Sequence, residues 1–236
     1  MVARAFFTFL ALLSLILPCV ATAAGRIAID VGHYLEEPGV ISAHGRPEFE
    51  FNRDLARELD AQLRSRGRAT QMIGENGSMN SLPERPRQAA GAALFVSVHH
   101  DSMQEFLLST WTHEGVERRY GERFEGFSLF VSRENPRWRK GLRCASAIGA
   151  ALIRAGFKPS LYHADPQVGE NRPFADKRNG VHYFDRLAVL RNAQMPALLF
   201  EAGVIVNRAE ELRMADPVVR TQIATAVTDG IEECMP

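Results

Sequence analysis

The stretch FVSVHHDSMQ, residues 95–104, joins a run of apolar and β-branched residues to two histidines and an aspartate. The run 93–98 is typical of a strand that is buried on both faces of a parallel sheet. Two other stretches have the same form: RIAIDVGHYL leads to His33, and MPALLFEAGVIVN leads to Glu201. Three apolar runs that each end on an ionisable group predict that these groups meet at one edge of a sheet.

Helical periodicity between these runs predicts an α/β fold. Phe51, Leu55, Leu59 and Leu63 recur at helical spacing, and Gly67 marks the expected end of that helix. Helices are expected at 49–66, 83–91, 140–155 and 217–233, and strands at 27–31, 69–73, 93–98, 127–131 and 197–201. Strands that alternate with helices predict one α/β domain, with a twisted, mostly parallel sheet flanked by helices.

Residues 1–24 have the composition of a secretory signal peptide, which sets the expected division of the chain into 1–24 and 25–236. Arg4 precedes an apolar core at 5–17, and small residues lead to an expected cleavage after Ala23 or Ala24. The core is shorter than the about 20 residues that span a membrane. We therefore expect no stable membrane anchor, with a retained leader as the alternative.

The charge balance gives no reason to expect a nucleic-acid partner. The chain has 28 basic and 28 acidic residues, and removal of the leader takes away Arg4 alone, which leaves a net charge of −1. Two cysteines remain outside the leader, Cys144 and Cys234. They could pair in an exported protein, but the sequence does not give their separation, so the disulfide stays open.

His33, His99 and Glu201 lie at the carboxyl ends of predicted strands, and Glu48 opens the first long helix. Two histidines and a carboxylate with one open position form a typical catalytic Zn²⁺ site. Such an ion lowers the pKa of a water molecule towards about 7. A carboxylate that does not bind the ion must then accept and return a proton. Glu201 is the candidate, because a glutamate within ALLFEAGV costs several kcal/mol unless it has a partner or a role.

Each of these residues also has a simpler explanation. A single histidine after a strand is more often a surface or hydrogen-bonded side chain than a ligand. Glu48 alone could be a carboxylate that the helix dipole favours in a first turn. Glu201 alone could pair with an arginine such as Arg191. The metal hypothesis depends on the convergence of the residues.

Four segments together resemble the motifs of the zinc-dependent N-acetylmuramoyl-L-alanine amidases of the Amidase_3 type. They are IAIDVGH, EFEFNRDLARELDAQLRSRG, LPERPRQAAGAALFVSVHHD and VLRNAQMPALLFEAGVIVN. The resemblance extends over about residues 26–233. In this family a glutamate precedes an asparagine by four residues, so Asn52 selects Glu48 over Glu50.

The resemblance implies a phosphorylase/hydrolase-like fold and hydrolysis of the amide between N-acetylmuramic acid and L-alanine in peptidoglycan. It implies that Zn²⁺ is held by His33, Glu48 and His99, and that Glu201 is catalytic. With the leader, it implies a periplasmic enzyme. The rival functions are a zinc peptidase that cuts elsewhere in the stem peptide, a catalytically weak wall-binding or regulatory protein, and a plain structural domain.

The sequence departs from the family pattern at several points. Tyr34 and Leu35 stand where glycines are usual, and His100 stands where a small residue is usual. The long segment 101–125 motivates the hypothesis that residues 102–123 form a lid or a docking surface for an activator protein. Segment 158–185 is also long for a simple connection. The histidines of these segments are not assigned to the metal: His113, His163 and His182.

Overall fold

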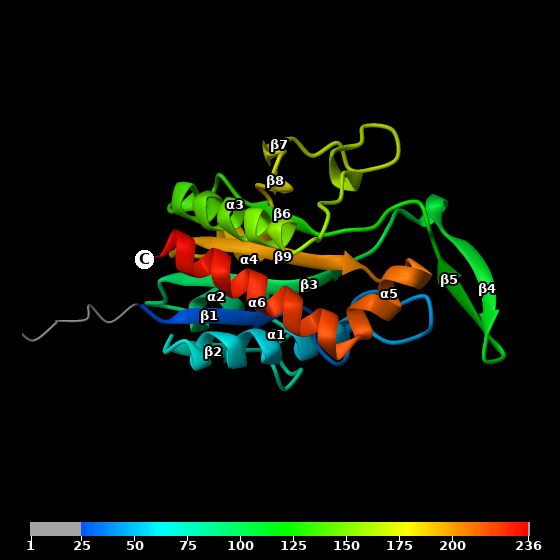
Figure 1. Cartoon of the computed structure of the whole chain (residues 1–236), viewed down its shortest axis with the longest axis horizontal. Helices are drawn as coiled ribbons and strands as arrows, with labels where there is room; N and C mark the ends of the chain where they lie inside the picture. The colour runs from blue at the N-terminus through cyan, green and yellow to red at the C-terminus, as the bar shows by residue number, and fades with distance from the viewer. Residues whose placement is uncertain (1–24, 236) are drawn as a thin grey trace, which may run out of the picture.

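The computed structural model describes residues 25–235, so the predicted leader lies outside the described residues. Seven strands form one sheet in the order β2-β1-β3-β9-β6-β8-β7 (Figure 1). Neighbouring strands run parallel, except for the pairs β6–β9 and β7–β8. The strands are β1 (Ile27–Val31), β2 (Thr70–Ile73), β3 (Leu94–Asp101), β6 (Ser128–Val131), β7 (Phe174–Asp176), β8 (Val181–Tyr183) and β9 (Ala197–Val204). The predicted α/β fold with a mostly parallel sheet is confirmed.

Helices cover both faces of this sheet. The long helices α1, α3 and α6 lie side by side on one face, in front of the strands in Figure 1. The short helices α2 and α4 contact each other and belong to the opposite face. The helices are α1 (Glu48–Ser65), α2 (Glu84–Gln88), α3 (Trp138–Arg154), α4 (Ala188–Arg191), α5 (Arg208–Ala215) and α6 (Pro217–Cys234).

Strand β3 shows how the apolar runs produce two cores. Its side chains alternate between the faces of the sheet. Leu94, Val96 and Val98 pack in the core beneath the long helices, whereas Phe95 packs in the core beneath the short ones. Because both faces are covered, the strand is apolar almost throughout until it reaches the histidines.

Two predicted strand ends are wrong in a way that matters for the site. Strands β3 and β9 continue to Asp101 and Val204, because they pair with each other as far as those two residues. His99 and Glu201 therefore lie within paired strands instead of at their ends. Only His33 follows its strand, two residues after Val31.

The two long segments contain strands that the sequence analysis did not predict. In 101–125, β4 (Ser109–His113) and β5 (Val116–Tyr120) form an antiparallel hairpin that projects beyond one end of the sheet (Figure 1). In 158–185, β7 and β8 extend the main sheet. Both segments thus contain strands, and neither is a simple connection.

The disulfide that the sequence left open is formed in the structure. Cys144 of α3 and Cys234 of α6 are bonded, with 5.0 Å between their Cα atoms. The bond joins two neighbouring helices near the end of the chain. Within residues 25–235 there is no helix with the length and hydropathy needed to cross a membrane.

Candidate metal centre

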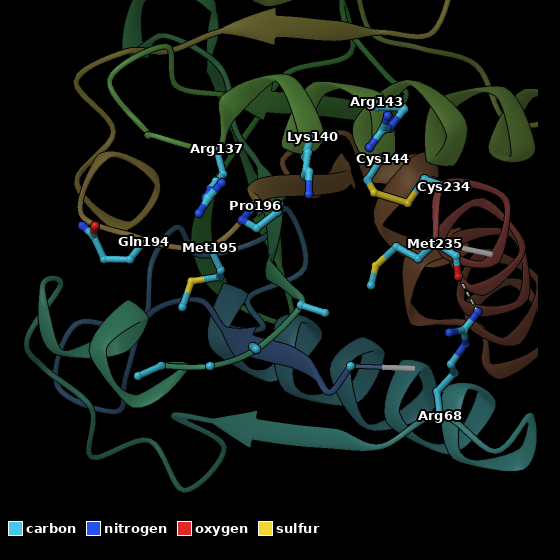
Figure 2. A pocket seen from close by; sticks show the side chains of 15 residues that line it. Arg68, Arg137, Lys140, Arg143, Cys144, Gln194, Met195, Pro196, Cys234 and Met235 are labelled. Atoms are coloured by element: carbon cyan, nitrogen blue, oxygen red, sulfur yellow. Dashed lines mark hydrogen bonds between the residues drawn. A yellow bond between two sulfur atoms is a disulfide. The ribbon is translucent and has the colours of Figure 1, made fainter. Parts of the chain in front are cut away.

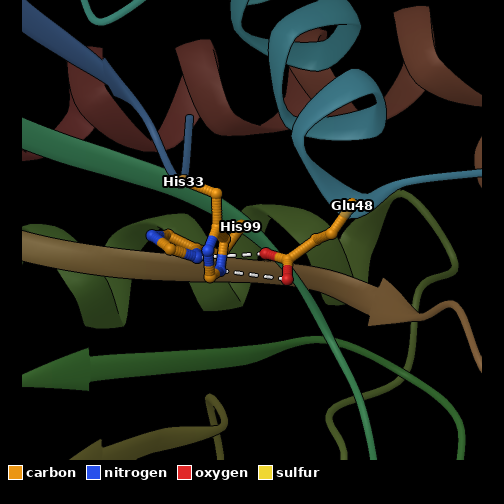
Figure 3. Close-up of side chains that lie close together, drawn as sticks. All are labelled: His33, Glu48 and His99. Carbon is orange, nitrogen blue, oxygen red and sulfur yellow. Dashed lines mark hydrogen bonds and ion pairs between the residues drawn. The ribbon is translucent and has the colours of Figure 1, made fainter. Parts of the chain in front are cut away.

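Three side chains that are far apart in the sequence converge near the carboxyl ends of β1 and β3: His33, Glu48 and His99, called the His–Glu–His cluster below (Figure 3). Their potential ligand atoms all lie within 4.8 Å of one another. The carboxylate of Glu48 lies between the two imidazoles, with His33 Nε2 3.1 Å from Oε2 and His99 Nδ1 3.1 Å from Oε1. The structure therefore brings together the three predicted ligands.

Glu48 is oriented by groups that surround its carboxylate. Asn52, one turn later on α1, donates from Nδ2 to Glu48 Oε1 at 3.0 Å and to the Gly32 carbonyl at 3.2 Å. The backbone N–H groups of His100 and Val40 lie 3.3 Å from Oε1 and Oε2, respectively. Residues four apart lie on the same side of a helix, which explains the Glu-x-x-x-Asn spacing in the sequence.

His33 is held by a buried arginine. Its backbone is left-handed, with φ = 65°, a conformation that costs about 1–3 kcal/mol for a residue other than glycine. Arg85 donates from Nη2 to the His33 carbonyl at 2.5 Å and from Nη1 to Asp30 Oδ1 at 2.8 Å. Ser97 donates to the other oxygen of Asp30 at 2.7 Å. Arg85 belongs to the segment LPERPRQAAGAALFVSVHHD, which was part of the family resemblance, but no such role was predicted for it.

Two glycines allow the close approach of the cluster to the backbone. A Cβ atom on Gly32 would lie 2.3 Å from the ring of His99. A Cβ atom on Gly39 would lie 2.3 Å from Glu48 Oε2, and Gly39 also has φ = 80°. Any side chain at these two positions would displace a member of the cluster.

The electrostatics of the cluster favour a bound cation. Burial would raise the pKa of Glu48, but its hydrogen bonds with His33 and His99 hold that pKa well below its usual value. Burial would lower the pKa of His33, but the hydrogen bond and the negative charge of Glu48 raise it instead. The ionised carboxylate attracts positive charge to this point, and two imidazole nitrogens with one carboxylate oxygen fit the donor preferences of Zn²⁺.

Glu201 lies next to the cluster on the neighbouring strand. His99 of β3 and Glu201 of β9 are register partners, so their side chains leave the same face of the sheet. Burial raises the pKa of Glu201 well above its usual value, and the negative charges of Asp101 and Glu48 raise it further. Within the described part of the chain, its buried Oε2 atom has no hydrogen-bond partner.

His100 faces away from the cluster and contacts α1. Its Nδ1 atom donates to Asn52 Oδ1 at 2.8 Å, and its ring lies 5.5 Å from that of Phe51. Burial lowers the pKa of His100 to about 3, so the ring is neutral at ordinary pH. This histidine supports Asn52, and Asn52 in turn orients Glu48.

A second charged network, which was not predicted from the sequence, lies next to the cluster. His163 lies between two carboxylates, with Nε2 2.6 Å from Asp101 Oδ2 and Nδ1 2.8 Å from Glu170 Oε2. Burial would lower the pKa of His163, but the two carboxylates raise it to about 9. The pKa of Glu170, which burial would raise, falls to about 2 through its contacts with His163 and Arg172. The only signal in the sequence was Asp101 itself, in an unusual His-His-Asp run.

The other two histidines of the long segments also lie outside the cluster. His182 is buried with both ring nitrogens unpartnered among the described residues, and burial lowers its pKa to about 4. His113 lies on the hairpin, with its ring stacked on Trp111 at 5.1 Å.

Comparison with known proteins gives the same family over nearly all of the described chain. Residues 27–233 match the Amidase_3 family, described as N-acetylmuramoyl-L-alanine amidase. The N-acetylmuramoyl-L-alanine amidase LytC of Bacillus subtilis (strain 168) is 23% identical over 208 residues. That alignment covers 86% of this chain but only 34% of LytC, so the chain spans about a third of that relative's length.

Solved structures show the same fold. The N-acetylmuramyl-L-alanine amidase Ami1 of Mycobacterium smegmatis superposes with a TM-score of 0.71 at 20% identity, over 90% of this chain and 97% of that one. The CwlD amidase of Clostridioides difficile, solved in complex with the GerS lipoprotein, gives a TM-score of 0.66 at 17% identity. That match covers 89% of this chain and 98% of CwlD.

Proposed function

Because the chain belongs to the Amidase_3 family, we propose that it is a zinc-dependent N-acetylmuramoyl-L-alanine amidase. In this proposal it hydrolyses the amide between the lactyl group of N-acetylmuramic acid and the L-alanine of the peptidoglycan stem peptide. One observation supports this proposal above all: an ionised carboxylate contacts two imidazoles beside Glu201, whose buried Oε2 atom lacks a partner among the described residues.

His33, Glu48 and His99 would hold the Zn²⁺ ion. The bound ion would lower the pKa of a water molecule and polarise the carbonyl of the amide. The protein contributes the geometry: Asn52 and two backbone N–H groups orient Glu48, and Arg85 orients His33 through its carbonyl. Groups that are fixed in this way need not reorganise during the reaction.

Glu201 would move the proton. The nitrogen of an amide must be protonated before it can leave, because an amide anion is too basic to depart. Burial and neighbouring negative charges raise the pKa of Glu201, which suits a carboxyl group that accepts a proton and later donates it to the leaving nitrogen. Its position opposite His99 in the register places it next to the cluster.

We also propose that the enzyme acts in the periplasm.

Segment 102–123 is proposed to be a docking surface for an activator protein. The hairpin in this segment packs against the loop before α1 and against α5, since Trp111 donates to the Ala43 carbonyl at 3.0 Å and Arg208 lies over Trp111 at 5.0 Å. These contacts support a docking surface more than a lid over the cluster. Phe106 is 68% exposed, which suits contact with a protein partner. The complex of CwlD with GerS shows that a related fold binds a second protein.

The proposed function is tested by metal analysis of the purified protein together with mass spectrometry of digested peptidoglycan. We expect about one zinc ion per chain and the release of intact stem peptides that begin with L-alanine. Shortened stem peptides would indicate the zinc peptidase instead. Sacculi that remain undigested by zinc-loaded protein would support a wall-binding protein without catalysis.

The isosteric variant Glu201→Gln tests the proposed proton transfer separately from metal binding. We expect it to keep zinc and to lose about 10²- to 10⁴-fold in kcat, the usual contribution of general acid–base catalysis. Glu36→Gln is the matched control, because Glu36 is an exposed glutamate outside the cluster. A Glu201→Gln enzyme with near-normal kcat would remove Glu201 from the mechanism.

A further inference from the structure

A basic pocket lies at the end of the sheet opposite to the His–Glu–His cluster. Figure 2 shows the side chains that line this pocket. It is called the amino-end pocket here, because it is lined by residues that precede β1, β3 and β9 and by the first turns of α3. Its volume is about 580 Å³, within the range of about 300–1,000 Å³ that is usual for small-molecule sites. The basic side chains that line it are Arg68, Arg137, Lys140 and Arg143.

These four positive charges have no compensating carboxylate in the described structure. The pocket lining contains no aspartate or glutamate, and no ion pair involves any of the four residues within 25–235. Arg68 Nη2 donates to the backbone carbonyl of Met235 at 2.7 Å, which holds the guanidinium at one side of the pocket. Arg137, just before α3, and Lys140, in its first turn, extend towards the pocket on the other side (Figure 2). Like charges that converge without a counterion repel one another, so an anion between them would be stabilised.

A phosphate group fits this arrangement better than a single carboxylate does. The planar guanidinium of arginine binds phosphate oxygens through paired hydrogen bonds, and lysine adds a further point charge. The pocket is lined by three arginines and one lysine, and its volume of about 580 Å³ leaves room for a group with more than one negative charge. This local excess of positive charge is not visible in the net charge of the whole chain, which is near zero.

The pocket is well separated from the proposed reaction site. Ala93 lines the pocket and His99 belongs to the cluster, and both lie along β3 or its approach. Six residues at about 3.3 Å each place them roughly 20 Å apart. A ligand in the amino-end pocket therefore does not occupy the metal centre, and its binding does not depend on zinc or on the proposed reaction.

We propose that the amino-end pocket binds a phosphate-bearing anion. Two sources share this chemistry: a free phosphorylated solute and the headgroup of an anionic phospholipid. The lipid source is considered because Gly25 lines the pocket and directly follows the predicted leader. A leader still held in a membrane would bring the pocket close to lipid headgroups.

The experiment uses the protein expressed with its own leader sequence and two probes at low salt. Inositol hexakisphosphate, measured by calorimetry, represents a free polyphosphate. Vesicles of phosphatidylcholine with or without phosphatidylglycerol, measured by co-sedimentation, represent the membrane source. Specific binding that weakens as salt is raised is expected for at least one probe, because exposed charges are screened. Saturation by the solute identifies a free ligand, whereas binding to phosphatidylglycerol vesicles alone identifies a headgroup.

A triple substitution tests whether the pocket is responsible, and a second triple substitution with the same charge change is its control. The pocket variant is Arg137→Gln/Lys140→Gln/Arg143→Gln, and the control is Arg178→Gln/Lys177→Gln/Arg213→Gln; all six side chains are exposed. We expect at least a tenfold loss of affinity in the pocket variant and less than a twofold change in the control. Both variants should retain the kcat of the wild type.

Two outcomes would overturn the proposal. One is the absence of saturable binding of either probe to the wild type. The other is an equal loss in both triple variants, which would show non-specific attraction to the whole surface. Should the pocket variant fold poorly, the single charge reversal Lys140→Glu tests the pocket in its place. Its affinity for the anionic probe is expected to fall, whereas its thermal stability should remain unchanged.

Discussion

The two ends of the sheet differ in how their charges are paired. At the carboxyl end, Glu48 lies between two histidines, and His163 lies between Asp101 and Glu170. At the amino end, four basic side chains line one pocket without an acidic residue among its lining. Paired charges fix the positions of side chains, as an active site needs. Charges without a partner are available for a ligand from outside.

The largest expected effect comes from removing a proposed ligand at the carboxyl end. His99→Ala should lose bound zinc and reduce peptidoglycan hydrolysis to the assay background, because a two-ligand site cannot hold the ion in place. Zinc content and dye release from labelled sacculi measure the two effects. His113→Ala, on the hairpin, is the control and should retain both. A His99→Ala protein that is still active would show that the charge pairing at this end serves stability alone.

Substitution of Arg85 tests whether stability and zinc binding at the carboxyl end depend on the buried ion pair between Arg85 and Asp30. Arg85→Met leaves the buried carboxylate of Asp30 without its positively charged partner, which costs about 3–5 kcal/mol in free energy of unfolding. Zinc affinity should fall as well, because the His33 carbonyl loses its donor. Urea unfolding and zinc titration provide the measurements. Arg87→Met, on the same helix, removes only an exposed ion pair with Glu84 and should cost less than about 1 kcal/mol.

The contrast between the ends also shows which features could be predicted from the sequence. The fold and three of the four proposed site residues follow from local patterns, because apolar runs that stop at an ionisable group are visible without a structure. Glu48 was selected over Glu50 only through a family resemblance, although its distance of four residues from Asn52 is now explained by a shared helix face.

The remaining features depend on contacts between distant segments. Arg85 binds Asp30, 55 residues earlier, and His163 binds Asp101, 62 residues earlier. The extension of β3 beyond Val98 depends on its pairing with β9 and has no local signal. The amino-end pocket was also hidden, because its basic residues come from two separate segments of a chain with balanced charge. Local patterns identified the candidate ligands but could not identify the residues that support them.

The disulfide tests whether the two ends of the sheet depend on each other, because both of its cysteines line the pocket at the amino end. Cys144→Ser/Cys234→Ser removes a cross-link between residues 90 apart, which should lower the free energy of unfolding by roughly 2–5 kcal/mol. The kcat on soluble fragments should stay within twofold at 25 °C, because the bond lies far from the His–Glu–His cluster. Urea unfolding of the variant is compared with that of the wild type in reducing buffer, and the two should coincide. A large loss of kcat in a folded variant would mean that the two ends are coupled.

The smallest predicted effect concerns the pH dependence of stability at the carboxyl end. The pKa of His163 is raised to about 9 by Asp101 and Glu170, from an unfolded value of about 6.5. The folded state binds this proton more tightly, so the stabilisation is fully present below about pH 6.5 and is lost as pH rises towards 9. His163→Gln should therefore be less stable than the wild type by up to about 3 kcal/mol at pH 6, with a difference that shrinks towards pH 9. Urea unfolding at intervals between these pH values measures this difference, and His113→Gln should follow the wild type throughout. A constant difference would show that His163 contributes packing alone, and that its two carboxylates do not hold a proton on the ring.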